Sequence, residues 1–250
     1  MAESAQSFDL ITIDRTGVDL YPLRSGVPLA RTAALRGTSG RSAARVAVAA
    51  ARLGRTSVVV HADAPDYFAI RAARIFWVTG TGLSEEPSRS ATLAALKARG
   101  RAGTTVFDLD WRPAQWADSA WKDPEEARPC YAEVLRHATV AVGDLDACEM
   151  ATGSREPRAC AEALLAAGVE LALVRQGSRG VLAVHRDGTT AEVVPGPAGT
   201  ADGPDADADT DMDDAFGGSL CHGLLSGWEL DRTLRYATAA GRPAAGEGPG

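Results

Sequence analysis

Short apolar segments rich in β-branched residues alternate along the chain with alanine- and leucine-rich segments whose apolar positions recur at helical spacing. This pattern predicts strands over residues 8–13, 57–61, 74–79, 104–109, 139–142, 171–175 and 181–185. It predicts helices over residues 42–53, 87–99, 124–137, 157–167, 215–226 and 230–240. Strands that are buried on both faces and joined through helices form a mostly parallel sheet. We therefore predict a three-layer α/β/α sandwich.

One domain is the expected organisation. A chain of 250 residues, of which 45% are hydrophobic, falls within the range of one large α/β domain. We place this domain at residues 1–241. Two segments interrupt the pattern: an irregular acidic stretch over 195–213 and a Gly/Pro/Ala-rich tail over 242–250, which we expect to be flexible.

The formal net charge of −7 argues against a nucleic-acid or anionic-membrane surface, so small molecules are the expected partners. The four cysteines form no CxxC pair, which indicates neither a disulfide framework nor a zinc site. The first residues lack the pattern of an export signal, and no apolar run reaches about 18 residues. We expect a soluble, cytoplasmic protein.

The segment Asp213-Asp214-Ala215-Phe216-Gly217-Gly218 places a carboxylate directly before a predicted helix that starts at Ala215. The unpaired amides and positive dipole end of a helix bind anionic phosphate, and a carboxylate beside them can accept a hydroxyl proton. The two glycines allow close approach of the backbone. Asp214 is therefore either a general base or an ordinary N-cap, for which Asp is also a preferred residue.

Several ordered segments carry a family resemblance. They are Ile11-Thr12-Ile13, Gly17-Val18-Asp19-Leu20-Tyr21-Pro22, the helical stretch 42–54, Phe107-Asp108-Leu109-Asp110-Trp111-Arg112-Pro113, the glycines of 176–180 and Asp214-Ala215-Phe216-Gly217-Gly218. Together they resemble the ribokinase/PfkB family of carbohydrate kinases, and most closely its 5-dehydro-2-deoxygluconokinase branch, which serves inositol catabolism.

The resemblance implies a ribokinase-like fold and ATP-dependent, Mg²⁺-assisted phosphorylation of a hydroxyl on a sugar or sugar acid, with Asp214 as the catalytic base. On the substrate side it implies Asp19, Gly40, Arg45 and Arg112. On the nucleotide side it implies Asp144, Arg175, Gly177, Gly180, Asp211, Met212, Asp213 and Thr238.

Some of these positions have a second interpretation. Arg45 replaces a sugar-binding asparagine, so it either binds a substrate carboxylate or crowds the pocket. Arg112 follows a strand in the run Asp-x-Asp-x-Arg-x-x-x-Trp that ends at Trp116; it either meets a substrate anion or forms a structural ion pair with a neighbour. Gly177 and Gly180 either approach the nucleotide or form a hairpin turn.

The chain also departs from the family. Asp211-Met212-Asp213 replaces a Gly-Ala-Gly loop, and each added carboxylate would repel a terminal phosphate by about 3 kcal/mol at about 5 Å in an effective dielectric of about 20. The family's Asn-x-x-Glu motif reads Asp144-Leu145-Asp146-Ala147 here, so its glutamate is missing. Glu149 lies two residues further on, which on a helix turns its side chain about 200° away from that of residue 147. The segment between Val60 and Arg74 is too short for the family's β-stranded lid, so we expect no lid, and a monomer.

Two other functions stay open. The first is a catalytically inactive relative that keeps a nucleotide or sugar site or serves as an interaction partner. The second is a calcium-binding loop in the acidic run 205–211, whose alternating carboxylates resemble the start of an EF-hand loop. In that register, however, Thr210 stands where glycine is expected and Phe216 where a glutamate is needed.

Overall fold

The computed structural model describes residues 8–14, 18–22, 35–39, 42–112, 123–195 and 212–241. Its strands are β1 (Leu10–Asp14), β2 (Val18–Pro22), β3 (Leu35–Ser39), β4 (Ser57–His61), β5 (Ile75–Thr79), β6 (Thr104–Asp108), β7 (Val140–Asp144), β8 (Leu171–Arg175), β9 (Val181–His185) and β10 (Thr190–Val193). Its helices are α1 (Ser42–Arg52), α2 (Tyr67–Ala72), α3 (Ser88–Arg99), α5 (Pro124–Leu135), α6 (Leu145–Thr152), α7 (Pro157–Ala167), α8 (Met212–Leu225) and α9 (Leu230–Ala240). Two short 3₁₀ turns, η2 (Thr81–Leu83) and η3 (Gly177–Arg179), follow β5 and β8.

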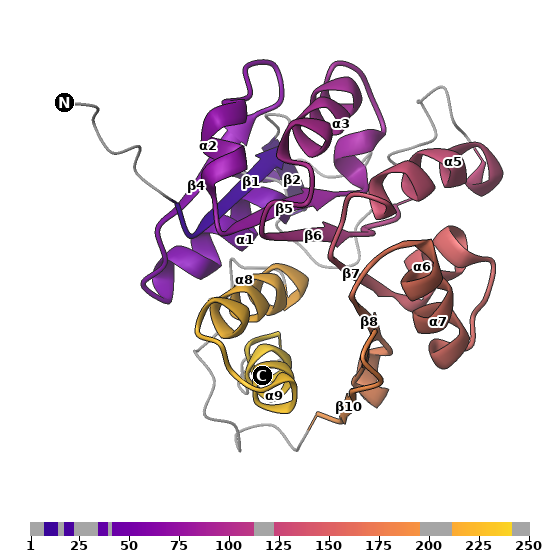
Figure 1. Ribbon diagram of the computed structural model, residues 1–250. Helices are drawn as coiled ribbons and strands as arrows, with labels where there is room; N and C mark the ends of the chain where they lie inside the picture. The colour runs from indigo at the N-terminus through magenta and orange to yellow at the C-terminus, as the bar shows by residue number, and fades with distance from the viewer. Residues whose placement is uncertain are drawn as a thin grey trace.

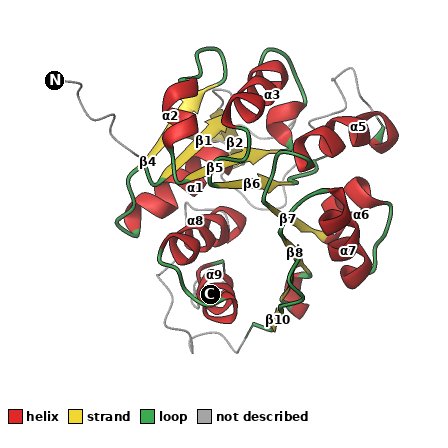
Figure 2. Cartoon of the chain, in the orientation of Figure 1, coloured by secondary structure: helices red, strands yellow, loops and turns green. Residues whose placement is uncertain are grey.

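Eight of the described strands form one sheet in the order β10-β9-β8-β7-β6-β5-β1-β4. The strands from β4 to β8 in this order pair in parallel, whereas β9 and β10 are antiparallel. Figure 2 shows the strands as a central layer with helices on both sides. The predicted three-layer sandwich with a mostly parallel sheet is confirmed.

Alternate residues of the central strands face two separate cores. On β5, Ile75 and Trp77 pack into one core, whereas Phe76 and Val78 pack into the other. The first core is covered by α1, α8 and α9, and the second by α2, α3, α5, α6 and α7 (Figure 1). Each strand therefore buries both of its faces, which is why the sequence shows continuous apolar runs rather than an alternating pattern.

All the strands and helices predicted from the sequence are present, with ends that shift by a few residues. The sequence pattern missed α2, α6 and three strands, β2, β3 and β10. The two helices have only six and eight residues, too short for a clear helical period. Their starts are fixed by side-chain caps instead: Asp66 accepts from the amides of Phe68 and Ala69, and Asp144 from that of Ala147.

The expectation of a chain without lid strands needs a correction. Between β4 and β5 the structure does contain only a turn and α2. However, β2 and β3 pair with each other in an antiparallel two-stranded sheet that is separate from the main sheet. Both strands mix polar and apolar residues without a clean period, so the hydrophobic pattern did not reveal them.

Helix α8 begins at Met212, three residues before the predicted start at Ala215, so the predicted irregular segment ends earlier than Asp213. Two of the glycines of α8, Gly217 and Gly218, pack closely against neighbouring elements. A Cβ on Gly218 would lie 2.4 Å from the Ala49 Cβ and 2.9 Å from the Ala50 nitrogen of α1. A Cβ on Gly217 would lie 2.9 Å from both the Trp77 ring and a Val46 methyl group. The close approach that these glycines permit is therefore between α8 and its neighbours, α1 and β5.

We expect Gly218→Ala to lower the free energy of unfolding by about 1–3 kcal/mol, because the new methyl group meets the backbone of α1, which cannot move aside. Gly217→Ala is the matched control: the atoms nearest to its methyl group belong to side chains rather than to backbone, and the gain in helix propensity of about 1 kcal/mol offsets part of its cost. Urea unfolding of both variants measures the difference. A Gly218→Ala variant as stable as the wild type would contradict this packing.

Candidate functional site at the carboxyl edge of the sheet

Parallel strands bring their carboxyl ends to one edge of the sheet, and polar residues gather there. Thr79 at the end of β5 is the register partner of Asp108 at the end of β6. Asp144 at the end of β7 is the partner of Arg175 at the end of β8. In sheets of this kind ligands bind beyond the carboxyl ends of the strands. This edge is therefore the candidate site.

Asp214 lies in the first turn of α8 and contacts the first turn of α1. The Ser42 hydroxyl donates a hydrogen bond of 2.6 Å to Asp214 Oδ1, and Arg45 Nη1 forms an ion pair with Asp214 Oδ2 at 3.5 Å. Only 2% of the Asp214 side chain and 12% of the Arg45 side chain are exposed. The sequence pattern predicted Asp214 directly before the helix, at its mouth. Instead the carboxylate is buried, with each oxygen in contact with α1.

The N-cap interpretation of Asp214 is wrong, because α8 starts at Met212 and Asp214 is the third residue of the helix. A helix that starts at Met212 leaves the backbone amides of its first three residues, 212–214, without an acceptor inside the helix. Asp214 therefore lies within the first turn of α8, among the residues whose amides begin the helix, and not one residue before it.

Ser42 is a site residue that the sequence analysis did not single out. It lies three residues before Arg45 in α1, which places both side chains on the same face of that helix. The run Gly40-Arg41-Ser42-Ala43-Ala44-Arg45 does not by itself point to Ser42, because its contact with Asp214 depends on the packing of α8 against α1.

A second polar group surrounds Asp110, just past the end of β6. Asp110 Oδ2 accepts a hydrogen bond of 2.7 Å from the Thr81 hydroxyl, and its Oδ1 accepts one of 2.7 Å from Arg112 Nε. The structural ion pair considered for Arg112 is thus present, while 44% of the Arg112 side chain remains exposed. Thr81 was not predicted as a site residue.

Burial raises the pKa of Asp110 above its usual value of 3.8, although the neighbouring Arg112 and, more weakly, Arg175 act in the opposite direction. The backbone of Asp110 has a φ of 31°, in the left-handed region that residues with a side chain rarely adopt. Such backbone strain persists only where the surrounding contacts enforce it, and it is common at functional sites.

Arg175 connects this group to α8. Its guanidinium lies 5.8 Å from the centre of the Phe216 ring, two residues after Asp214, and its charge acts on Asp110. Beside it, Asp144 accepts the Ala147 amide at 2.8 Å and so caps α6. Glu149 forms an ion pair with Arg155 at 2.5 Å. The charges predicted for the nucleotide side at Asp144 and Arg175 therefore do lie together.

The predicted glycine pair forms the turn between β8 and the antiparallel β9, which is the hairpin alternative. Gly177 and Gly180 both have positive φ, and a Cβ on Gly180 would lie 1.9 Å from the Val193 carbonyl oxygen of β10.

Thr238 lies near the end of α9, and its buried Oγ1 has no hydrogen-bond partner within the described residues. Because α9 follows α8 and packs on it, this end of α9 returns to the end of α8 that holds Asp214.

Several predicted residues cannot be placed. Gly40, Asp211, Trp116 and the acidic run 205–211 lie outside the described residues. Asp19 lies in β2, and Met212 and Asp213 in the first turn of α8, but only their backbone is described.

Within the described ranges, no cluster of three or more His, Cys, Asp or Glu side chains could hold a metal ion. Asp144 is the predicted nucleotide-side carboxylate that the structure places at this edge.

Within the described ranges, none of the helices combines the length and apolar character needed to cross a bilayer.

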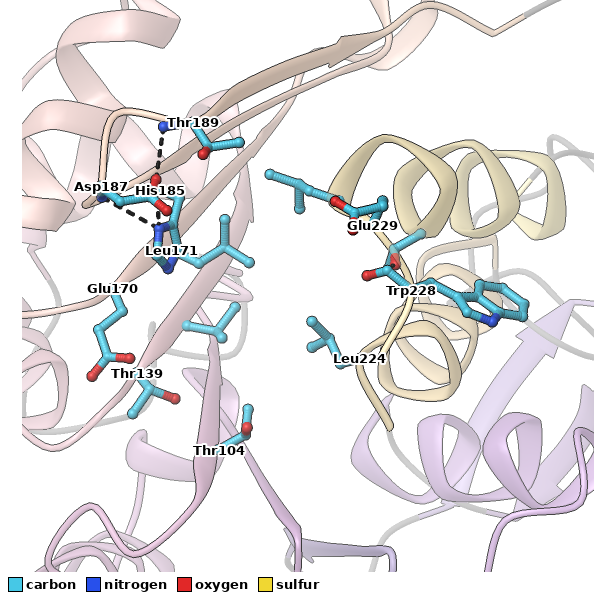
Figure 3. Close-up of a pocket in the computed structure, with 13 residues that line it drawn as sticks. Thr104, Thr139, Glu170, Leu171, His185, Asp187, Thr189, Leu224, Trp228 and Glu229 are labelled. Atoms are coloured by element: carbon cyan, nitrogen blue, oxygen red, sulfur yellow. Dashed lines mark hydrogen bonds and ion pairs between the residues drawn. The ribbon is translucent and has the colours of Figure 1, made fainter. Parts of the chain in front are cut away.

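A cavity of about 340 Å³ lies at the other edge of the sheet. Figure 3 shows its two facing walls. One holds residues in or next to the strands, including Thr104, Thr139 and Leu171, and the other holds Leu224 at the end of α8 and Trp228 in the turn that follows. The strand residues stand at the starts of β6, β7 and β8. Leu224 is ten residues from Asp214, or about 15 Å along α8. This cavity is therefore separate from the candidate site.

The raised pKa of Asp110 predicts a pH-dependent effect of Asp110→Asn. Above pH 3.8 the unfolded chain releases a proton that the folded protein still holds, so the contribution of Asp110 to stability falls as the pH rises through its folded pKa. The variant lacks this loss. We expect its free energy of unfolding to improve relative to the wild type between pH 4 and 7 (about 1.4 kcal/mol for each unit of pKa shift), as measured by urea unfolding. A relative stability that worsens over this range would contradict the assignment.

Comparison with known proteins agrees with this architecture. The model of the pfkB family of carbohydrate kinases matches residues 62–247. A 5-dehydro-2-deoxygluconokinase from Shouchella clausii is 29% identical over 175 residues, which cover 68% of this chain and 50% of that protein. The chain thus spans about half the length of this curated relative.

Solved structures share the fold. A PfkB protein from Polaromonas sp. JS666 superposes with a TM-score of 0.77 at 18% identity, covering 94% of this chain and 95% of the other. A protein described as a ribokinase II from E. coli, in complex with ATP and Mg²⁺, superposes with a TM-score of 0.76 at 16% identity, covering 94% and 91%. Together with the family match over most of the chain, the fold and the carboxylate at the start of α8 lead to one conclusion: the chain belongs to the PfkB family of carbohydrate kinases.

Proposed function

We propose that this protein is an ATP-dependent sugar-acid kinase that uses Asp214 as its general base. The observation that carries the proposal is the position of Asp214: a buried carboxylate in the first turn of α8, at the carboxyl edge of a PfkB-type sheet. A carboxylate is suited to accept a hydroxyl proton, and the adjoining helix start is suited to bind phosphate.

The reaction has a simple balance. A substrate hydroxyl oxygen forms a bond to the γ-phosphorus, the bond between that phosphorus and ADP breaks, and the hydroxyl proton passes to Asp214. The backbone amides at the start of α8 and the dipole of this helix stabilise the negative charge on the phosphoryl group. Arg175, beside the same turn, adds a positive charge on the nucleotide side.

The substrate class follows from the cations of the site and from the relatives. Arg45 and Arg112 both lie at the carboxyl edge, and guanidinium groups bind carboxylates with two parallel hydrogen bonds. The Shouchella clausii relative is named for a kinase of a sugar acid, 5-dehydro-2-deoxygluconate. Mg²⁺ would neutralise phosphate charge in the bound nucleotide, and Asp144 is a candidate carboxylate to hold it.

Asp214→Asn tests the role of the base. The amide keeps the shape of the side chain but cannot accept the proton, so we expect ADP formation from ATP, Mg²⁺ and 5-dehydro-2-deoxygluconate to fall by about 10²–10⁴-fold. A coupled assay measures ADP formation, and circular dichroism checks the fold of the variant. Sugar-dependent turnover that survives in Asp214→Asn would remove this residue from the mechanism.

A catalytically inactive relative is the second candidate function. The ion pair of Asp214 with Arg45 favours it, because a base held by a neighbouring guanidinium is not free to approach a hydroxyl. The replacement of the family's Gly-Ala-Gly loop by Asp211-Met212-Asp213 favours it as well, because carboxylates near a phosphoryl group would repel it.

Ligand-induced stabilisation separates the two candidates. A kinase should gain thermal stability from Mg-ATP and from the sugar acid, by about 2.7 kcal/mol at a ligand concentration 100 times the Kd, and should also turn over. An inactive relative with a retained site should show the gain without turnover. Thermal unfolding with Mg-ATP, the sugar acid and Ca²⁺ measures this. Stabilisation by Ca²⁺ alone would instead favour the acidic run 205–211 as a binding loop.

A further inference from the structure

The carboxylate of Asp214, which the proposed reaction needs as its base, already contacts two side chains of α1. Asp214 Oδ1 accepts from Ser42 at 2.6 Å, and Oδ2 lies 3.5 Å from Arg45 Nη1. Both charged side chains are nearly buried. For Asp214 to receive a hydroxyl proton, the substrate must reach an oxygen that now faces Ser42 or Arg45.

Moving Arg45 away without replacement is costly. A carboxylate and a guanidinium removed from water depend on each other, and removing one partner leaves an uncompensated buried charge. The guanidinium of Arg45 can therefore leave Asp214 most readily when another anion takes the place of the carboxylate. A substrate with its own carboxylate supplies that anion, whereas a neutral sugar does not.

The other cations of this edge have different contacts. Arg112 forms its ion pair with Asp110, and Arg175 lies over Phe216. Arg45, by contrast, forms an ion pair with Asp214 itself. Arg45 lies near the start of α1, three residues after Ser42. Its long side chain can turn from one carboxylate to another while the helix stays fixed.

We propose that Arg45 is a carboxylate-exchange residue: in the unliganded protein it pairs with Asp214, and in the complex it pairs with the carboxylate of a sugar acid and thereby releases the base. This inference rests on the proposed function and deepens it. Arg45 then sets the preference for acidic over neutral sugars, and the base becomes available only when such a substrate is bound.

Competition between two carboxylates for one guanidinium gives a distinctive binding signature. Asp214→Asn removes the internal competitor, so the sugar acid should bind more tightly than to the wild type. Arg45→Gln removes the shared partner, so the preference for the acid should be lost. A purely structural ion pair would change the binding of acidic and neutral sugars alike.

The experiment measures the Kd of 5-dehydro-2-deoxygluconate and of its neutral analogue, with CH₂OH in place of the carboxylate, by isothermal titration calorimetry without ATP. We expect the preference for the acid, the ratio of the two Kd values, to rise about 10-fold in Asp214→Asn and to fall about 10- to 100-fold in Arg45→Gln, the range that a charge-assisted hydrogen bond provides. Arg52→Gln, in the last turn of the same helix, is the matched control and should keep the wild-type ratio.

Arg45→Lys keeps the charge and guards against misfolding of Arg45→Gln; it should retain part of the preference. An unchanged ratio in both Asp214→Asn and Arg45→Gln would overturn the exchange, even if the wild type turns over. Wild-type turnover, assayed separately, tests the proposed function: binding with the predicted ratios but no turnover would overturn the kinase and keep the exchange. A wild type that binds neither compound would overturn both.

Discussion

The start of α8 is held against the start of α1 by one carboxylate, and the site depends on that contact. Asp214 is only 2% exposed, so its charge requires a partner, and α1 supplies both a hydroxyl and a guanidinium. The close approach has a packing cause a few residues further on, where Gly217 and Gly218 let α8 lie directly against Trp77 and α1. The same geometry that excludes larger side chains from α8 therefore brings Asp214 within reach of Ser42 and Arg45.

The parallel sheet supplies the rest of the site. Its strands end at one edge, where the helix starts of α6 and α8 and the charges of Asp110, Arg112 and Arg175 gather. Asp110 is buried with a positive φ, and three groups act on it: Thr81, Arg112 and Arg175. A buried carboxylate with an unusual backbone costs stability, so its partners must hold it in place. Such a fixed arrangement of charges is what phosphoryl transfer requires, since this reaction depends mainly on positioning and electrostatics.

The long elements of the fold could be predicted from the sequence because each long helix buries an apolar stripe and each central strand buries both of its faces. The boundaries of β4, β8, β9, α7 and α9 agree with the prediction to the residue. The start of α8 could not be predicted: the acidic residues before Ala215 suggested a loop, yet Met212 and Asp213 are helical. Short elements such as α6 and β10 also escaped, since a cap or a hairpin partner, rather than a hydrophobic period, determines them.

The candidate site was predictable only in part. The position of Asp214 before an apolar helical pattern marked it as a candidate, and the resemblance to a kinase family named Arg175 and Arg45, but no pattern in the sequence revealed that Arg45 and Ser42 both meet Asp214. That contact joins residues 169 and 172 positions apart and depends on how two helices cross. The glycines illustrate the same limit, because their need for close approach was evident while the neighbour, α1, was not.

The contact between Asp214 and Arg45 can be tested most directly by a double-mutant cycle on the free energy of unfolding. The single variants Asp214→Asn and Arg45→Gln and the double variant are unfolded in urea under the same conditions. A buried pair predicts that the double variant loses less stability than the sum of the single losses, with a coupling of about 1 kcal/mol or more. Losses that add within about 0.5 kcal/mol would show that the two side chains do not interact, and would contradict this account of the site.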